Sequence, residues 1–575
     1  KSWLDKISKA NKVIKKIQIL RGKFKKYNID GYIIPKNDDY FTEYSKINRL
    51  KIISKFSGSA GVAVILKNKN YLFTDGRYTI QSQIESGKNF KIIGIENLVN
   101  CKLFKNLTLG IDPKLFTYNQ IKKISKYNKI KLIEKNLIDE IEKQKVSNSF
   151  EFFSLNKKIV GESTNSKLNK ISRYLKKNKS DYLFISAPEN VAWTLNIRGG
   201  DNPNSPMPNS RLIISKTKQK ILISNKKKCR KLIRKKIIST KEVIENKEFQ
   251  SKILALKGKN FIIDNNSCSI FYEDIIKSKF KIIRKEDPTY ILKSIKNKTE
   301  ISNMIKTHIQ DGIALTRFIY WIKNINKNKI TEVDAQNKLE KFRRKNKNFL
   351  YPSFDTIAGS GKNGAIVHYR AKKESCRIIN NKDIFLCDSG GQYKYGTTDV
   401  TRTICFSKQS QNIKNIFTNV LKGHIAVATT NLNKDNIGKK IDIRARKFLK
   451  QNNLDYAHGT GHGVGFFLNV HEGPQSISKY NKVKIQEGMI LSNEPGYYKK
   501  EKFGIRIENL VYVKKIGKKK IFENLTFAPI EKELINFKLL TPSEKNYLFN
   551  YHLNVYLNIS KYLKPKEKKW LATFI

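Results

Sequence analysis

Short apolar runs and amphipathic stretches alternate along the first 295 residues of the chain. Apolar runs bounded by glycine, proline or polar clusters predict buried strands, and three of them lie at 32–35, 61–66 and 70–74. The third runs into an Asp-Gly-Arg turn that we expect to cap a helix near 78–82. Helix and strand signals in alternation predict an α/β fold for this half of the chain.

The same order of signals returns after a polar stretch around 140–160, which we interpret as a linker. A helix is expected near 167–176, and strand signals follow at 181–186, 211–215 and 219–224. The two segments therefore predict one fold used twice. Trp193 is expected in the core of the second copy, because tryptophan in such patterns mostly packs against other apolar side chains.

The pattern changes from about residue 296. Residues 300–323 predict one long amphipathic helix, and Thr331 begins another, with Asp334 three residues later as a capping acid. The glycine-rich stretch 351–369 lacks the Gly-Lys-Ser/Thr ending of a phosphate loop, so we exclude nucleotide binding there. The expected domains are 1–150, 157–295 and 296–537, with a C-terminal helical extension at 538–575.

Two apolar runs flank a pair of glycines between residues 386 and 403, which predicts a β-hairpin. Asp388 and Asp399 lie near the ends of its two arms, where their carboxylates can face each other. Two carboxylates that close repel, and one of them has to protonate unless a cation lies nearby. The hairpin alone leaves open whether a metal ion is present.

Three of the seven histidines lie close together in the sequence, among several glycines. His458 and His462 belong to the motif His-Gly-Thr-Gly-His, and His471 follows in Val-His-Glu-Gly-Pro. Glycine disfavours a helix, so we expect a loop or an irregular strand that holds the imidazoles at a cleft. Isolated histidines are more often structural, and we expect that role for His308, His424 and His552.

Two glutamates complete the candidate site. Glu494 ends an apolar run, and Glu508 lies on an alternating strand with Arg506 on the same side. With the two aspartates and His462 they make four carboxylates and one imidazole, and four negative charges match two divalent cations. Oxygen-rich ligation favours Mn²⁺, with Co²⁺, Fe²⁺ or Zn²⁺ as alternatives. A water shared by two cations about 3.5–4 Å apart ionises near neutral pH and becomes the nucleophile of a hydrolase.

The chain carries 114 lysine and arginine residues against 49 acidic ones, a formal net charge of +65. Such a charge suits a nucleic-acid or anionic-membrane surface. The lysines are scattered through every segment, however, whereas a binding face concentrates basic residues and favours arginine. We attribute the charge to a lysine-rich composition and expect no specific nucleic-acid partner, only weak, salt-sensitive adhesion to polyanions.

Six cysteines are spread along the chain without a Cys-x-x-Cys pair. This spacing excludes a zinc ribbon or a disulfide framework and favours a reducing, cytoplasmic compartment. No run reaches the roughly 18 apolar residues that span a bilayer, so we expect no membrane partner. Residues 1–20 are basic and amphipathic, as in a transit peptide, but we favour a surface helix of the first domain. The cysteines are Cys101, Cys229, Cys268, Cys376, Cys387 and Cys405.

The acidic and histidine motifs resemble the five-ligand set of the pita-bread metallopeptidases, which include methionine aminopeptidase, prolidase and aminopeptidase P. The detailed similarity is to the three-domain aminopeptidase P branch, whose two N-terminal domains are creatinase-like. This similarity is carried by residues 352–368, 396–403, 458–465 and 540–571. The resemblance implies two creatinase-like α/β domains followed by a pita-bread catalytic domain.

The resemblance also implies a ligand role for each of five residues. Asp388 and Glu508 would bind the first metal ion, and Asp399 and Glu508 would bridge the two ions. His462 and Glu494 would complete the second ion. No ligand of the family's set is missing from this chain.

Further roles follow from the same resemblance. His368 and His458 would contact the substrate, and His471 would orient it or shuttle a proton; Glu494 joins these histidines as a catalytic residue. Other positions that match the proline pocket or the surroundings of the ligands are Val470, Tyr498 and Arg506.

The activity that the resemblance implies is release of the first residue from Xaa-Pro-Yaa peptides by a homodimeric Xaa-Pro aminopeptidase. Proline's tertiary amide has no N–H, and a metal ion would polarise its carbonyl. Prolidase, a dipeptidase, is the main alternative, whereas a non-catalytic scaffold and metal-free creatinase chemistry conflict with the complete ligand set. Apolar residues of the extension suit either dimerisation or packing on their own domain: Tyr547, Leu548, Leu553, Tyr556, Leu557 and Tyr562.

Overall fold

The structure is a computed structural model that describes residues 2–100, 103–144 and 150–575, and the side chains of 12–98, 103–144 and 150–575. Cys101 therefore lies outside the described residues. The chain forms two compact units. The first comprises Lys1–Asn156, Glu162–Pro203 and Met207–Thr289, and the second comprises Lys157–Gly161, Asn204–Pro206 and Tyr290–Ile575.

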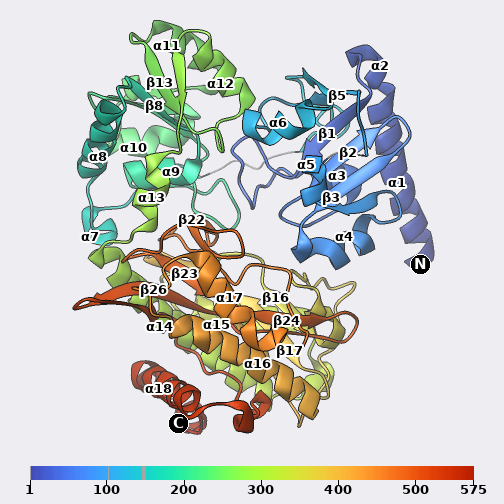
Figure 1. The fold of residues 1–575 in the computed structure, drawn as a ribbon, viewed down its shortest axis with the longest axis vertical. Helices are drawn as coiled ribbons and strands as arrows, with labels where there is room; N and C mark the ends of the chain where they lie inside the picture. Colours follow the sequence, from blue (N-terminus) through green and yellow to red (C-terminus); the bar gives the residue numbers. More distant parts are fainter. Residues whose placement is uncertain (1, 101–102, 145–149) are drawn as a thin grey trace. The chain divides into compact units, whose positions relative to one another are not determined.

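The first unit begins with a six-stranded mixed sheet flanked by helices (Figure 1). Its strands, in spatial order, are β4 (Lys91–Gly94), β3 (Asn70–Thr74), β2 (Val62–Leu66), β1 (Gly31–Pro35), β5 (Thr108–Ile111) and β6 (Lys129–Leu132). The helices include α1 (Ser2–Gly22), α3 (Arg49–Ser54), α4 (Thr79–Ser86) and α6 (Tyr118–Ser125). As expected, Asp75 caps the turn before α4, since its carboxylate accepts from Arg77 N.

A second six-stranded sheet in the same unit follows in sequence. Its strands, in spatial order, are β12 (Val243–Ile244), β11 (Lys220–Ile223), β10 (Arg211–Ser215), β8 (Tyr182–Ile185), β13 (Asn260–Ile263) and β14 (Lys281–Arg284). Its helices include α8 (Thr164–Lys177), α9 (Pro188–Leu195), α11 (Phe249–Ala255) and α12 (Ile270–Lys277). Trp193 is buried, as the sequence predicts.

The two sheets share one topology. In the first, β1 pairs antiparallel with β2 and parallel with β5. In the second, β8 pairs antiparallel with β10 and parallel with β13. The strands at one edge of each sheet also correspond, because β3–β4 and β11–β12 are both parallel pairs. The prediction of one α/β fold used twice is confirmed, while the individual domain boundaries stay predictions.

The second unit contains four sheets, each of two to five strands. They are β15 (Phe349–Pro352), β18 (Gly391–Tyr393) and β19 (Gly396–Thr397); β16 (Ile357–Ser360), β17 (Phe385–Ser389) and β20 (Val400–Ile404); β22 (Glu472–Ile477), β21 (Gly461–Gly463), β23 (Ile490–Asn493), β26 (Asn509–Ile516) and β27 (Lys519–Asn524); and β24 (Gly496–Lys499) with β25 (Phe503–Arg506). Helices α14 (Lys298–Asn324), α15 (Glu332–Arg344), α16 (Gln411–Ala428) and α17 (Gly438–Lys450) accompany these sheets (Figure 1).

Local sequence signals fix the starts of the long helices. Asn297 and Glu300 form a capping box at α14, and Thr331 and Asp334 form the predicted one at α15. These reciprocal hydrogen bonds satisfy backbone N–H groups that have no partner in the first helical turn.

The C-terminal extension packs on its own unit. Helix α18 (Pro542–Ile559) buries Leu548 and Val555 in a core with Phe417 and Ile505. Leu557 and Tyr562 stay exposed, so only part of the apolar face expected from the sequence is covered within the chain.

Within the described ranges the cysteines are free thiols. No helix of the described chain is long and apolar enough to cross a membrane.

Candidate metal centre

The predicted hairpin is formed by β17 and β20, which pair antiparallel with Asp388 opposite Thr401. An inner pair, β18 and β19, closes the turn between them. Asp388 is part of β17, and Asp399 immediately precedes β20. The two aspartates therefore come from neighbouring arms, as the sequence predicts, and both are buried.

Three other segments bring the remaining candidates to the hairpin. His462 lies in the middle of the short strand β21, and Glu494 directly follows β23. Glu508 falls in the break between β25 and β26 instead of on a strand, and it forms an isolated bridge with Thr401. Gly461 has to be glycine, because a Cβ there would collide with the carbonyl oxygen of Ser492.

The five candidate ligands converge. The carboxylates of Asp388, Asp399 and Glu508 approach one another within 4.8 Å. His462, Glu494 and Glu508 form a second group on the same criterion, so Glu508 belongs to both. A third group, Asp399, His462 and His471, meets the same criterion, so the three groups overlap at Asp399, His462 and Glu508.

The orientation of the His462 ring suits a ligand. Its Nδ1 lies 2.8 Å from the carbonyl oxygen of Gly463, and since a carbonyl only accepts, the proton belongs on Nδ1. Nε2 points to the other side, at 3.3 Å from both Asp399 Oδ2 and Glu494 Oε1. A ring nitrogen oriented by a backbone carbonyl and pointing into carboxylates is the usual arrangement of a metal-binding histidine.

The electrostatics of the cluster call for added positive charge. Burial and repulsion by neighbouring carboxylates raise the pKa of Asp399 and the pKa of Glu508 well above their ordinary values. Burial also raises the pKa of Glu494. Asp388 Oδ1 and Glu508 Oε1 are buried and have no hydrogen-bond partner. Buried carboxylate oxygens without donors fit the coordination of divalent cations.

One buried arginine partly balances these charges. Arg506 donates to Asp388 Oδ2 at 2.7 Å and to the hydroxyl of Tyr498 at 2.7 Å. It also donates to Thr401 Oγ1 at 3.2 Å. A single guanidinium facing four carboxylates leaves most of the negative charge uncompensated.

His458 continues this polar chain. Its Nδ1 lies 2.7 Å from Gly459 O, which places the proton on Nδ1 and makes Nε2 an acceptor. The Tyr498 hydroxyl therefore donates to His458 Nε2, at 2.7 Å, while it accepts from Arg506. Hydrogen bonds thus run from Arg506 through Tyr498 to His458.

The other residues predicted for the site lie around the ligands. The ring of His471 stands edge-on to that of His462, with 4.4 Å between centroids. Val470 is fully buried. His368 is half-buried in an irregular loop, and the carbonyl oxygen of its neighbour Val367 accepts from Arg506 at 3.4 Å. The roles assigned to these residues from the sequence stay predictions.

Two hydroxyl groups of the site escaped the sequence analysis. Thr401 donates to Glu508 Oε2 at 2.6 Å, and Ser492 donates to Glu494 Oε1 at 3.0 Å. Ser492 also accepts from the backbone of His462. Each lies two residues from a ligand in sequence, but serine and threonine are too common for that spacing to be a signal.

Another acidic group in the second unit already has a cation beside it. Cys405, Glu531 and Glu533 approach one another, but the ammonium group of Lys323 pairs with both glutamates. The histidines expected to be structural are buried in packed surroundings: His308, His424 and His552.

Family comparisons cover nearly the entire chain. The Creatinase/Prolidase N-terminal domain matches twice, at residues 16–140 and 142–300. Metallopeptidase family M24 matches residues 302–515, and the C-terminal region of peptidase M24 matches 521–573. The predicted combination of creatinase-like and metallopeptidase domains is confirmed.

Relatives of similar length match as well. A probable Xaa-Pro aminopeptidase P of Laccaria bicolor is 36% identical, with 96% of this chain and 91% of the relative covered. Xaa-Pro aminopeptidase 1 of Dictyostelium discoideum is also 36% identical, with 96% and 94% covered.

Among solved structures, the X-prolyl aminopeptidase of Caenorhabditis elegans, described as a cytosolic enzyme with a di-nuclear active site, superposes with a TM-score of 0.90. It is 28% identical and covers 98% of this chain and 99% of its own. The prolidase of Pyrococcus furiosus reaches a TM-score of 0.50 at 25% identity and covers 62% of this chain and 98% of its own.

Proposed function

We propose that this chain, which belongs to metallopeptidase family M24, is a metal-dependent aminopeptidase that hydrolyses the Xaa-Pro bond at the N-terminus of peptides. One observation carries the proposal: four carboxylates and His462 converge, and two of the carboxylates keep a buried oxygen without a donor. The substrate class follows from the relatives, which match over nearly their full length and are named for this activity.

The ligand set fits two divalent cations. Asp388, Asp399 and Glu508 would hold one ion, and His462 and Glu494 would complete the other, with Asp399 and Glu508 shared. When bound, the ions would polarise the scissile carbonyl and lower the pKa of an attacking water toward neutrality. We propose Mn²⁺ as the native ion, because most of the ligand atoms are carboxylate oxygens.

The chain's own side chains would bind and orient the peptide around these ligands. His458, fixed by Gly459 and Tyr498, is held as an acceptor at Nε2, and we assign it with His368 to substrate contact. His471 stands against His462 and is assigned to proton movement or substrate orientation. Val470 and Tyr498 are assigned to the proline pocket.

Arg506 has a different task. Its guanidinium holds one oxygen of Asp388 and the hydroxyl of Tyr498 at the same time. It therefore fixes a metal ligand and a residue of the proposed substrate pocket relative to each other. A bidentate, permanently charged donor is suited to such a bridge, whereas lysine is not.

Prolidase activity is the alternative that an experiment has to separate. The chain, loaded with Mn²⁺, is offered Xaa-Pro dipeptides and Xaa-Pro-Yaa tripeptides that share the same first residue. Release of the first residue from the tripeptide supports the aminopeptidase. Release from dipeptides alone would replace it by a prolidase. No hydrolysis of either peptide, in protein with two ions bound, would overturn both.

Two further properties are proposed. A cytoplasmic location is supported by the cytosolic C. elegans structural neighbour and by the free thiols of the described cysteines. A homodimer is supported by the exposed apolar residues Leu557 and Tyr562 of the C-terminal extension. Sedimentation equilibrium of the full chain tests the dimer, and a monomer at micromolar concentration would contradict it.

A further inference from the structure

Glu332 is a buried carboxylate outside the metal centre. It is the first residue of α15 and is 0% exposed. Four neutral groups donate to it: Ser360 N at 2.7 Å, Asn363 Nδ2 at 3.0 Å, the Tyr369 hydroxyl at 2.7 Å and Arg377 N at 3.0 Å. A buried carboxylate is costly unless donors surround it, and here they do so almost completely.

All four donors belong to one stretch of chain, residues 360–377. Apart from a short 3₁₀ turn at Gly361–Ala365, this stretch contains no regular secondary structure after Ser360. It consequently lacks the backbone ladder that would fix a strand or helix. Glu332 takes over that task, because it binds both ends of the stretch and two side chains within it.

His368 lies inside this stretch, between two anchored neighbours. On one side, the Val367 carbonyl oxygen accepts from Arg506, which also binds Asp388 of the metal centre. On the other side, the Tyr369 hydroxyl donates to Glu332. The backbone of His368 is therefore held from the metal centre and from α15 at once.

Asn363 also contacts both Tyr369 and Glu332. Asn363 Nδ2 lies 3.0 Å from the Tyr369 hydroxyl and 3.0 Å from Glu332 Oε1, so the three side chains form a closed triangle. Burial and the adjacent Glu332 raise the pKa of Tyr369, which keeps its hydroxyl protonated and able to donate.

We propose that Glu332 is a positioning residue for His368: through Tyr369 and Asn363 it sets where the imidazole stands relative to the substrate. This inference rests on the proposed function, in which His368 contacts the peptide. Catalytic groups have to be held within about 0.5 Å, and a misplacement of 1 Å costs on the order of a hundredfold in rate. An irregular loop reaches that precision only if a rigid element holds it, and α15 is that element.

Two substitutions test the proposal. Tyr369→Phe removes one hydrogen bond to Glu332 and keeps the ring in place. Glu332→Gln replaces one of the two acceptor oxygens by an NH₂ group, which cannot accept, so the two donors at that oxygen lose their partner. We expect kcat/KM on an Xaa-Pro-Yaa tripeptide to fall about tenfold for Tyr369→Phe and about a hundredfold for Glu332→Gln. Bound metal should stay at the wild-type stoichiometry, because neither side chain belongs to the ligand set.

The chain offers a matched control. Tyr393 is also buried, and its hydroxyl donates to a buried carboxylate, Asp311 Oδ1, at 2.6 Å. Tyr393→Phe therefore removes the same kind of hydrogen bond without touching residues 360–377. If Glu332 and Tyr369 serve only stability, both tyrosine variants lose thermal stability alike and keep kcat/KM within about twofold of wild type.

A double-mutant cycle with His368→Ala separates positioning from other effects. If Tyr369 acts through His368, the tenfold loss disappears once the imidazole is gone. An equal loss in the His368→Ala background, or an equal loss in Tyr393→Phe, overturns the positioning role. An inactive wild-type chain instead overturns the proposed function, and the positioning role with it. Failure of the positioning role alone leaves the wild-type chain active, so the two outcomes are distinguishable. Tyr369→Phe decides the matter even if Glu332→Gln does not fold.

Discussion

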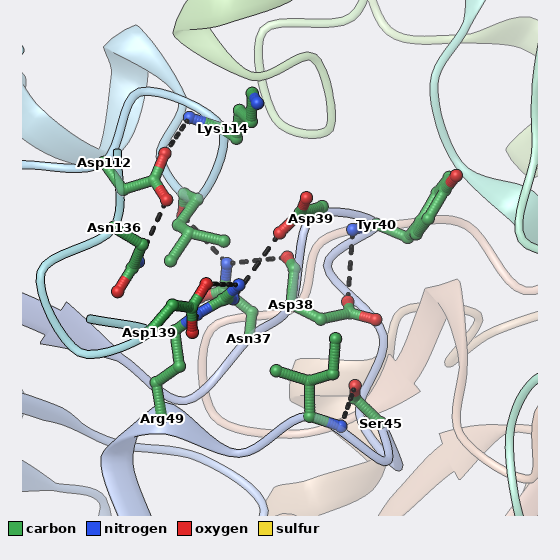
Figure 2. A network of polar contacts seen from close by, with 12 residues as sticks. Asn37, Asp38, Asp39, Tyr40, Ser45, Arg49, Asp112, Lys114, Asn136 and Asp139 are labelled. Atoms are coloured by element: carbon green, nitrogen blue, oxygen red, sulfur yellow. Dashed lines mark hydrogen bonds and ion pairs between the residues drawn. The ribbon is translucent and has the colours of Figure 1, made fainter. Parts of the chain in front are cut away.

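The acidic network at one edge of the first sheet and the candidate metal centre each hold four carboxylates. In the first sheet, Asp38 and Asp39 follow β1, Asp112 follows β5, and Asp139 lies beyond β6, so the aspartates gather where parallel strands end (Figure 2). Asp38 and Asp112 are buried, as are the ligands Asp388 and Asp399. The number of acidic groups therefore does not distinguish the two regions, and each contains buried carboxylates, although the side chains of Asp39 and Asp139 stay 40% and 38% exposed.

Hydrogen-bond donors do distinguish them. Figure 2 shows Asp112 accepting from Asn136 and from Lys114 N, and Arg49 reaching both oxygens of Asp139. Asp38 accepts from Thr42 N at 2.9 Å and from the Thr42 hydroxyl at 2.8 Å.

In the metal centre, by contrast, Asp388 Oδ1 and Glu508 Oε1 have no donor. Burial raises the pKa of Asp38 and the pKa of Asp112, and the neighbouring carboxylate of Asp39 raises both further, as burial and neighbouring carboxylates do for Asp399 and Glu508. The pKa shifts therefore do not distinguish the two regions, whereas the missing donors do. We infer that a buried carboxylate cluster is suited to bind metal ions where some of its oxygens lack hydrogen-bond donors.

The largest effect separating the regions is expected for Asp399→Asn. The amide removes a shared ligand, so we expect the protein to lose at least one bound ion. Turnover of an Xaa-Pro-Yaa peptide should fall by at least about a thousandfold, since metal polarisation contributes several kcal/mol. Elemental analysis of the purified protein and steady-state kinetics measure the two losses.

Asp112→Asn is the matched control for this substitution. It replaces a buried aspartate of the first sheet by the same amide and should leave metal content and turnover unchanged. Unaltered metal stoichiometry in Asp399→Asn would remove the bridging role assigned to that residue.

A smaller effect, on stability and not on metal binding, is expected for Arg49→Ala. The variant leaves the carboxylate of Asp139 without its two-pronged partner, and the free energy of unfolding should fall by about 1–3 kcal/mol. Metal stoichiometry should not change. Urea unfolding followed by circular dichroism measures the loss, and a stability equal to wild type would show that water replaces Arg49 at no cost.

The pH dependence of the stability of the metal-free protein provides a third test. Asp399, Glu494 and Glu508 have raised pKa values in the folded chain, so between their ordinary and their raised values the folded state binds more protons than the unfolded state. Stability therefore falls as pH rises through that window, by about 1.4 kcal/mol per pH unit for each excess proton.

Bound metal should reverse this trend, because cations bind the deprotonated ligands. Tm measured from pH 5 to pH 9, with Mn²⁺ and with a chelator, should give two curves that diverge as pH rises. The network of Figure 2 contributes equally to both curves, so parallel curves would contradict the assignment of the metal to this cluster.

The sequence predicted the parts of the candidate site that are local, while the roles of these residues stay predictions. Asp388 and Asp399 lie on one hairpin, and His458 and His462 stand out because glycines surround them. Residue type and spacing were therefore enough to select these four residues as candidates. Glu332 shows what local patterns miss. In sequence it is an ordinary acid in the first turn of a helix, but its donors lie 28 to 45 residues away. Only tertiary packing turns a helix-start glutamate into the anchor of a loop.

The smallest expected effect concerns Thr401, the one hydroxyl that serves both Glu508 and Arg506. Thr401→Val keeps the shape of the side chain and removes the hydrogen bond that holds the Glu508 carboxylate in place. We expect metal affinity to fall about fivefold, corresponding to about 1 kcal/mol for one hydrogen bond. Thr403→Val, on the same strand, is the control, because its hydroxyl donates to a backbone carbonyl, Arg506 O, and not to a ligand. Titration of the chelator-treated protein with Mn²⁺ measures both. A rise in affinity for Thr401→Val would instead mean that the hydroxyl competes with the metal for Glu508.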